Sequence, residues 1–133
     1  MNTLDIIKFM GERGGRFPKD SIKEIIHYFS NMIRDGRVVV IYKEKEIYAF
    51  VTFALTDEYE RFYKKKTWDY VPHDKSGKIM YVEFMVCKQW NKQLRYQFQS
   101  EILKLYPQIE EAHWHRWASY GDRLITWRRK LYV

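Results

Sequence analysis

The 133-residue chain is long enough to bury a hydrophobic core without disulfides or a structural metal, and its length fits one domain over residues 1–133. Because 46% of the residues are hydrophobic and 18% are aromatic, the composition excludes an intrinsically disordered chain. The formal net charge of +7 favours anionic partners such as phosphates, CoA-type cofactors or nucleic acid, without choosing among them.

Cysteine content and hydropathy indicate a cytoplasmic protein. Cys87 is the only cysteine, so no intrachain disulfide can form, as is usual in a reducing compartment. No apolar run approaches the length of a membrane span, and the first residues lack the basic, apolar and small-residue order of a signal peptide. We therefore expect a cytoplasmic protein that does not associate with a membrane.

The first predicted element is a helix over "TLDIIKFM", with Leu4, Ile7 and Met10 at helical spacing and Thr3 as its N-cap. A second helix begins at the capping box of Ser21 and Glu24, and ends at Asp35-Gly36. Its predicted apolar face consists of Ile22, Ile25, Ile26, Phe29 and Ile33.

A hairpin of two strands follows, over Arg37–Tyr42 and Glu46–Leu55. The second strand is apolar at odd and even positions, which is typical of a central strand covered on both faces. The next segment, Thr56–Gly77, is polar but rich in aromatic residues. We expect a surface excursion packed by its own aromatic side chains, or a functional loop.

The segment Lys78–Lys88 predicts a strand in which Tyr81, Glu83 and Met85 share one face, opposite Val82 and Phe84. An amphipathic helix over Lys92–Tyr106 and a strand over Glu111–Ala118 come next. After the turn "SYGD", the segment Arg123–Val133 reads as a last strand or, second, as a helix.

This order predicts an α+β fold around a mixed sheet, with one helix in a late β-α-β unit. A right-handed crossover requires the strands Lys78–Lys88 and Glu111–Ala118 to be parallel neighbours.

The order of elements and the stretch "YVEFMVC" (Tyr81–Cys87) resemble the GNAT family of acyl-CoA-dependent N-acyltransferases. In some of these enzymes a Glu within this apolar strand is the general base that deprotonates the attacking amine. The resemblance therefore implies a GNAT-like mixed sheet, acetyl-CoA or another acyl-CoA as cofactor, and an amine on a small molecule or protein as acceptor. It assigns the base to Glu83 and, at the only nearby tyrosine, a general acid to Tyr120.

The family pattern after this strand is Q/R-x-x-G-x-G/A, and the nearest frame here is "QLRYQF". Gln93 occupies the first position, but Tyr96 and Phe98 stand where the pattern has glycines. The resemblance implies that backbone N–H groups near Val86 or Cys87 polarise the thioester carbonyl. It implies also that the CoA pyrophosphate faces a group of polar side chains, which are Lys88, Lys92, Gln93 and Arg95.

Without glycines, the cations must supply more of the attraction for the phosphates, and the side chains of Tyr96 and Phe98 must point away from them. Phe98 can do so because it lies on the apolar face with Leu94 and Ile102. Few residues follow Ala118, so we expect a reduced GNAT fold or one completed by another chain, which is compatible with a dimer.

Considered apart from the family resemblance, the candidate site residues allow several other roles. Glu83 could act as a base with a raised pKa, bond to Tyr or His groups, pair with an Arg in the core, or lie at an exposed edge. The cations near the start of the late helix could bind an anion or form a solvated basic end. His113 and His115 share one face of a strand, but with no third ligand at metal-like spacing we expect no metal site.

Two further functions compete with acyl transfer. "WHRWASYGDRLITWRRK" interleaves Arg and Trp, which can bind single-stranded nucleic acid, although cross-strand packing in a hairpin is the favoured interpretation. The missing glycines favour a third possibility, a non-catalytic GNAT-fold domain that binds other proteins.

Overall fold

The computed structural model describes the backbone of residues 2–12, 22–58, 60–64, 68–118 and 121–128; the side chains of residues 63, 114–118 and 121–128 lie outside this description. The elements in chain order are α1 (Thr3–Glu12), α2 (Ile22–Arg34), β1 (Val38–Lys43), β2 (Glu46–Thr56), α3 (Glu60–Tyr63), β3 (Ile79–Cys87), α4 (Lys92–Leu105), β4 (Glu111–Ala118) and β5 (Gly121–Arg128).

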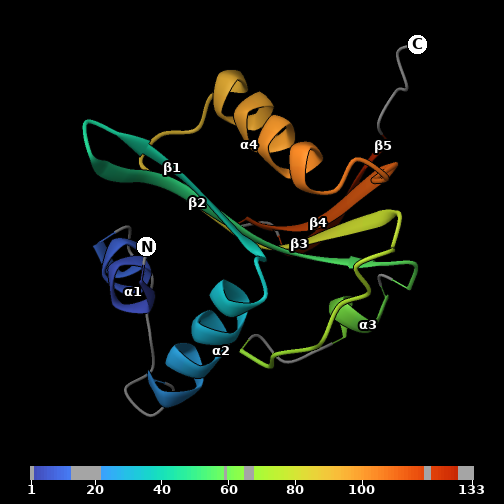
Figure 1. The fold of residues 1–133 in the computed structure, drawn as a ribbon, viewed down its shortest axis with the longest axis horizontal. Helices are drawn as coiled ribbons and strands as arrows, with labels where there is room; N and C mark the ends of the chain where they lie inside the picture. Colours follow the sequence, from blue (N-terminus) through green and yellow to red (C-terminus); the bar gives the residue numbers. More distant parts are fainter. Residues whose placement is uncertain (1, 13–21, 59, 65–67, 119–120, 129–133) are drawn as a thin grey trace.

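The strands form one five-stranded sheet in the order β1-β2-β3-β4-β5. All neighbours are antiparallel except β3 and β4, which run parallel and are joined through α4. The predicted α+β fold with a late β-α-β unit is therefore confirmed. The last described segment, Gly121–Arg128, is a strand and not a helix. Figure 1 shows α4 on one face of the sheet and α1, α2 and α3 on the other.

Both early helices form, but their buried faces differ from the predicted ones. In α1 the buried residues include Ile6 and Phe9, whereas Leu4 is 68% exposed. Asn2, not Thr3, supplies the helix cap, because its Oδ1 accepts a hydrogen bond from the N–H of Asp5 at 2.9 Å. Helical spacing alone did not decide which of two adjacent apolar stripes faces the sheet.

The same rotation occurs in α2, whose buried residues are Ile25, Tyr28, Phe29 and Met32. Ile22 and Ile26 are 42% and 38% exposed, so the predicted isoleucine face was wrong at these two positions. Tyr28 takes the buried place because its ring packs edge-on against Phe29, Trp68 and Phe84. The capping-box residue Ser21 lies outside the described residues.

The end of α2 is a Schellman motif at the predicted Asp35-Gly36 position. Gly36 has φ +69°, the N–H of Gly36 donates to Ile33 O at 3.1 Å, and the N–H of Arg37 donates to Met32 O at 2.9 Å. Arg37 leaves this motif directly into the sheet, where its O accepts from the N–H of Phe53 at 3.1 Å. The backbone of Arg37 is thus held from both sides.

Strand β3 contains a β-bulge at Glu83, which the strict alternation predicted from the sequence did not include. Thr52 of β2 pairs with Phe84 and Phe53 pairs with Val82, so Glu83 is the extra residue. The bulge turns Phe84 onto the face of α2, whereas Val82 stays on the face of α4. The assignment of Phe84 to the face of Val82 was therefore wrong.

The sheet separates two hydrophobic cores. On the α4 side, Leu94, Phe98 and Ile102 pack against β2 and β3, as the predicted helix face requires. On the other side, the buried residues of α1 and α2 pack against Val38 and Phe50. The apolar pattern of β2 at odd and even positions follows from this, because both of its faces are covered.

The segment between β2 and β3, residues 57–77, packs onto the sheet through two of its aromatic rings. Trp68 stacks on Phe84 with ring centroids 4.9 Å apart, and Phe62 stacks on Tyr81 at 5.9 Å. A surface excursion packed by its own aromatic side chains was expected, but these two rings stack on residues of β3 instead.

Across the described part of the chain, no helix is both long and apolar enough to cross a membrane.

Candidate functional site

The parallel strands β3 and β4 part halfway along their length. Their pairing starts at Ile79 with Glu111 and ends at Val82 with Trp114, although β3 continues to Cys87 and β4 to Ala118. The two strands therefore splay apart beyond this point, and the splay opens at the bulge residue Glu83. Beyond Val82, β3 is no longer paired with β4.

Backbone donors of β3 point into this splay. The N–H of Phe84 donates to Thr52 Oγ1 at 3.1 Å and the N–H of Lys88 donates to Tyr48 O at 2.9 Å, so both point toward β2. Because the direction alternates along a strand, the N–H groups of Met85 and Cys87 point the other way, toward the splay. Of the two residues predicted to polarise a carbonyl, Cys87 has the suitable orientation, and Val86 does not.

Helix α4 begins directly beyond the splay, where Asn91 is its N-cap. Asn91 Oδ1 accepts a hydrogen bond from the N–H of Leu94 at 2.8 Å. The N–H of Arg95 donates to Asn91 O at 3.4 Å, so the N–H groups of Lys92 and Gln93 lie ahead of the first intrahelical bond. The cap thus occupies one of the donors that a phosphate would use and leaves the two before it.

The predicted phosphate-facing side chains lie near this helix start with different surroundings. Lys92 and Gln93 are exposed, and Arg95 is half-buried. Lys88 is an exposed partner of Glu46, with the two charged atoms 3.5 Å apart. Phe98 is 3% exposed and packs in the α4 core, on the apolar face predicted for it, whereas the side chain of Tyr96 is 63% exposed.

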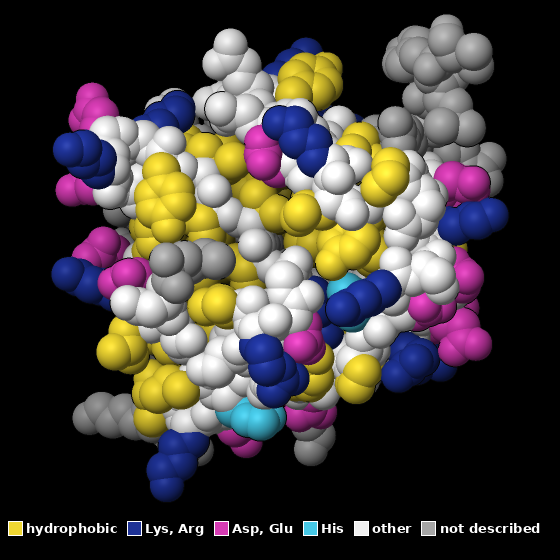
Figure 2. Space-filling view, in the orientation of Figure 1, with side chains coloured by type: hydrophobic (Ala, Val, Ile, Leu, Met, Phe, Trp, Pro, Cys, Tyr) yellow, Lys and Arg dark blue, Asp and Glu magenta, His cyan; other side chains and the backbone are white. Residues whose placement is uncertain are grey.

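Positive charge is not concentrated on one patch of the face shown in Figure 2. Lys and Arg side chains are spread around that face, with Asp and Glu among them. Attraction for an anion at the start of α4 would therefore come from the particular cations there rather than from the net charge of +7.

Glu83 does not reach a cleft. Its side chain is 1% exposed, and its Oε2 is 3.0 Å from Nη2 of Arg37, whose side chain is 0% exposed. A general base must be open to its substrate, and a carboxylate held by a buried guanidinium is not. This geometry favours the alternative of an Arg partner in the core over the base that the resemblance implies.

Hydroxyl groups surround the same buried pair. Tyr28 Oη lies 3.0 Å from Thr52 Oγ1, the atom that also accepts from the N–H of Phe84 next to the bulge. Burial raises the pKa of Tyr28 well above its ordinary value, and the charge of Glu83 raises it further. Burial likewise lowers the pKa of Arg37, against the opposing effect of Glu83. Tyr28 is therefore a neutral hydroxyl that can donate but cannot act as a base.

Cys87 is half-buried at the end of β3, packed against the α4 core. Burial raises the pKa of its thiol, so the thiolate is disfavoured at neutral pH. Cys87 therefore contributes its backbone N–H to the splay and is a poor nucleophile.

Other residues singled out in the sequence fall partly outside the description. Tyr120, the predicted general acid, lies outside the described residues, and so do the side chains of the Arg- and Trp-rich segment. His113 is 5% exposed, and its Nε2 lies 3.2 Å from Glu111 Oε2. Among the described side chains, no group of three or more His, Cys, Asp or Glu could hold a metal ion.

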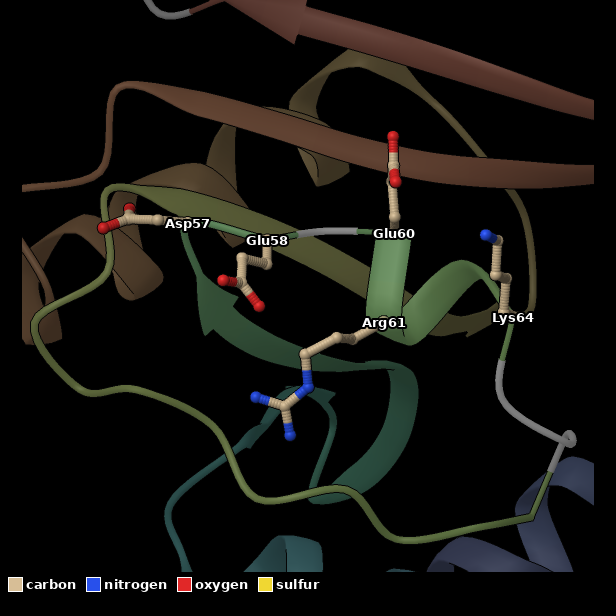
Figure 3. Close-up of a pocket in the computed structure, with 5 residues that line it drawn as sticks. All are labelled: Asp57, Glu58, Glu60, Arg61 and Lys64. Carbon is tan, nitrogen blue, oxygen red and sulfur yellow. The ribbon is translucent and has the colours of Figure 1, made fainter.

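A polar pocket of about 450 Å³ lies at the opposite end of β3 from the splay. It is lined by Asp57, Glu58, Glu60, Arg61 and Lys64. Figure 3 shows Glu60 and Arg61 extending to opposite sides of α3. Its charged, open lining resembles a solvated surface hollow more than an acyl site, which is usually largely apolar.

Arg37 is the residue of this region that the sequence reasoning missed. It was read as the first residue of a strand, although an Arg between a helix-ending Asp-Gly and the apolar run "VVVIY" is unusual. Because the side chain of Arg37 is fully buried, its charge must find a partner in the core, and Glu83 is that partner. These two charged residues beside apolar runs were the sequence signal for a buried ion pair.

The sequence matches no protein-family profile and no curated protein. Among the solved structures that share the fold, two are GNAT-like proteins. One is the GphF GNAT-like decarboxylase in complex with isobutyryl-CoA, with TM-score 0.61, 15% identity, and coverage of 90% of this chain and 66% of that chain. The other is the loading GNATL domain of CurA from Lyngbya majuscula, with TM-score 0.56, 12% identity, and coverage of 85% and 59%.

This chain thus spans less than two thirds of the length of either structure. At these identities the likeness concerns the fold, and it shows that the chain has a GNAT-like fold.

Proposed function

Starting from the GNAT-like fold, we propose that this protein binds an acyl-CoA in the splay between β3 and β4 and transfers its acyl group to an amine. The observation that carries the proposal is the parting of the two strands at Glu83, with the start of α4 directly beyond it. The GphF structure, which shares the fold, contains isobutyryl-CoA.

The splay fits the extended part of such a ligand, because the N–H groups of Met85 and Cys87 point into it. The start of α4 fits the diphosphate less closely, since Asn91 caps the N–H of Leu94. Lys88, Lys92, Gln93 and Arg95 therefore provide a larger share of the attraction than backbone donors do.

An acyl-CoA supplies an activated thioester. The N–H of Cys87 is oriented to hydrogen-bond the thioester carbonyl and to stabilise the negative charge that develops on its oxygen. Attack by the neutral amine forms a C–N bond and breaks the C–S bond. Because Glu83 is held by Arg37, the proton of the amine passes to water rather than to a protein carboxylate, and Tyr120 is the proposed donor to the leaving sulfur.

One alternative has specific support in the structure. The buried Arg37–Glu83 pair and the Asn91 cap both remove groups that catalysis would use. A GNAT-fold domain that binds other proteins without catalysis would show the same features. A nucleic-acid-binding role is a weaker alternative that rests on the Arg- and Trp-rich segment.

Calorimetry with acetyl-CoA at low and high salt separates these possibilities. Wild-type binding should weaken with salt, as expected for exposed charge pairs. The change Lys92→Ala should weaken it by roughly two- to fivefold, the range of a solvent-exposed ion pair, whereas Lys104→Ala at the other end of α4 should not. No binding at millimolar acetyl-CoA would favour the non-catalytic alternative, and salt-sensitive oligonucleotide binding would favour the nucleic-acid one. If binding is found, release of free CoA in the presence of amines tests the transfer itself.

A further inference from the structure

The guanidinium of Arg37 joins three separate segments of the chain. Its Nε donates to Phe53 O of β2 at 2.8 Å, and its Nη1 donates to Val71 O in the 57–77 segment at 2.8 Å. Its Nη2 donates to Glu83 Oε2 in the β3 bulge at 3.0 Å. One fully buried side chain therefore fixes the distances between β2, β3 and the 57–77 segment.

The position of this guanidinium is itself tightly determined. The Schellman motif holds the N–H of Arg37 against Met32 O, and the ladder to β2 holds its O against the N–H of Phe53. The ring of Tyr70 packs on the guanidinium, with the central carbon 5.2 Å from the ring centroid. Because backbone and side chain are both held, Arg37 acts as a fixed point for the segments bonded to it.

Its place relative to the splay gives this fixed point a function. The last pair between β3 and β4 joins Val82 and Trp114, and Glu83 is the next residue. Arg37 therefore holds β3 at the residue where it departs from β4. Through Val71, it holds the 57–77 segment against the same bulge.

We propose that Arg37 is the positioning residue of the acyl-CoA site. By binding Glu83 and Val71 at once, it sets the opening of the splay and the place of the segment beside it, without touching the ligand. This inference rests on the proposed function for its ligand, but the arrangement of the two segments can be tested without any ligand.

The substitution Arg37→Lys tests the proposal most directly. A lysine keeps the charge for Glu83, but its single ammonium group cannot reproduce the planar arrangement of three donors. Amide exchange in residues 68–74 and 84–87 should become roughly tenfold faster if one charge-assisted hydrogen bond is lost in local opening. The amide of Asp74, which donates to Leu55 O at 2.9 Å, is a defined reporter. The matched control Arg34→Lys makes the same change at an arginine that is 65% exposed on α2 and should leave both segments unchanged.

A double variant distinguishes positioning from stability in general. Arg37→Met with Glu83→Met removes both buried charges and should recover most of the global stability that either single change loses. Val71 O still lacks its donor, so exchange in residues 68–74 should stay fast, and affinity for acetyl-CoA should stay several-fold weaker than in the wild type. Full recovery of both in the double variant would overturn the proposal.

Amide exchange in Arg37→Lys and acetyl-CoA binding by the wild type together separate this proposal from the proposed function. Unchanged exchange in both segments of Arg37→Lys overturns the proposal whatever the affinity. Faster exchange in both segments, with a wild type that does not bind acetyl-CoA, leaves Arg37 as the positioning residue of these segments and rejects the proposed function instead.

Discussion

Arg37 and Glu83 are 46 residues apart in the sequence, yet their side chains meet at 3.0 Å with 0% and 1% exposure. Both charges are unusual where they stand, because Arg37 directly precedes the apolar strand β1 and Glu83 lies within the apolar strand β3. Their pairing explains the lone Glu in "YVEFMVC" without assigning it to catalysis. We therefore expect a replacement of Glu83 to lower the stability of the fold, because it removes the buried partner of Arg37.

We expect Glu83→Gln to reduce the free energy of unfolding by about 3–5 kcal/mol, because it leaves the buried charge of Arg37 uncompensated. Urea unfolding measured by circular dichroism checks this value. The control Glu46→Gln removes the carboxylate of an exposed pair, in which Glu46 is 78% exposed, and should cost about 0–1 kcal/mol. An unchanged unfolding midpoint in Glu83→Gln, together with a loss of turnover by orders of magnitude, would return Glu83 to the role of general base.

His73 should make stability depend on pH. Its Nδ1 accepts from the N–H of Leu55 at 3.3 Å, and burial together with the charge of Arg37 lowers its pKa from 6.5 to about 4. Between these values the unfolded chain binds a proton that the folded chain does not, so stability falls as the pH is lowered through this window. We expect a loss of roughly 1–2 kcal/mol, less than the full shift would give, because the ring is partly exposed to solvent.

The variant His73→Asn keeps an acceptor for the Leu55 N–H but does not titrate. The difference in unfolding free energy between wild type and variant should therefore change in favour of the variant from pH 7 to pH 4.5. Other titrating groups cancel in this difference. His27→Gln, at an exposed position on α2, serves as the control, and a constant difference across the range for His73→Asn would contradict the prediction.

Asn91 should affect stability and cofactor affinity in opposite directions. Asn91→Gly removes the cap on the N–H of Leu94 at a cost of a few tenths of a kcal/mol and frees that donor for a phosphate. Asn91→Asp keeps the cap and adds a negative charge at the helix start. We expect acetyl-CoA to bind more tightly to the Gly variant and more weakly to the Asp variant. Calorimetry of the two variants checks the order of affinities, and the reverse order would place the phosphates away from α4.

Two glycines should differ in why they resist substitution. A Cβ on Gly77 would lie 2.6 Å from the backbone N of Thr56, so Gly77→Ala forces a backbone shift and should cost about 1–3 kcal/mol. A Cβ on Gly36 would meet nothing within 4 Å, but its φ of +69° makes Gly36→Ala cost roughly 1–2 kcal/mol.

Asparagine tolerates this left-handed conformation better than most residues, so Gly36→Asn should lose less than Gly36→Ala. At Gly77 the same change should lose at least as much as alanine does, because the obstacle there is backbone. Urea midpoints of the four variants distinguish the two causes. Equal tolerance of Asn at both positions would show that neither account holds.

The order of the elements, apart from the short helix α3, and the parallel placement of β3 and β4 could be predicted from the sequence alone. Local signals determine both: Asp35-Gly36 ends a helix, β-branched runs form strands, and a β-α-β connection is right-handed. The α4 face of Leu94, Phe98 and Ile102 was likewise determined by periodicity, because its apolar stripe has no rival. These features depend on neighbours close in sequence.

The tertiary structure decided what depends on partners distant in sequence. Helical spacing could not choose between adjacent apolar stripes in α1 and α2, since the choice depends on the shape of the sheet they cover. Alternation could not reveal the bulge at Glu83, because an inserted residue is visible only against the register of β2. The partner of Glu83 likewise emerged only when folding buried Arg37 beside it, since burial without a partner would be too costly for either charge.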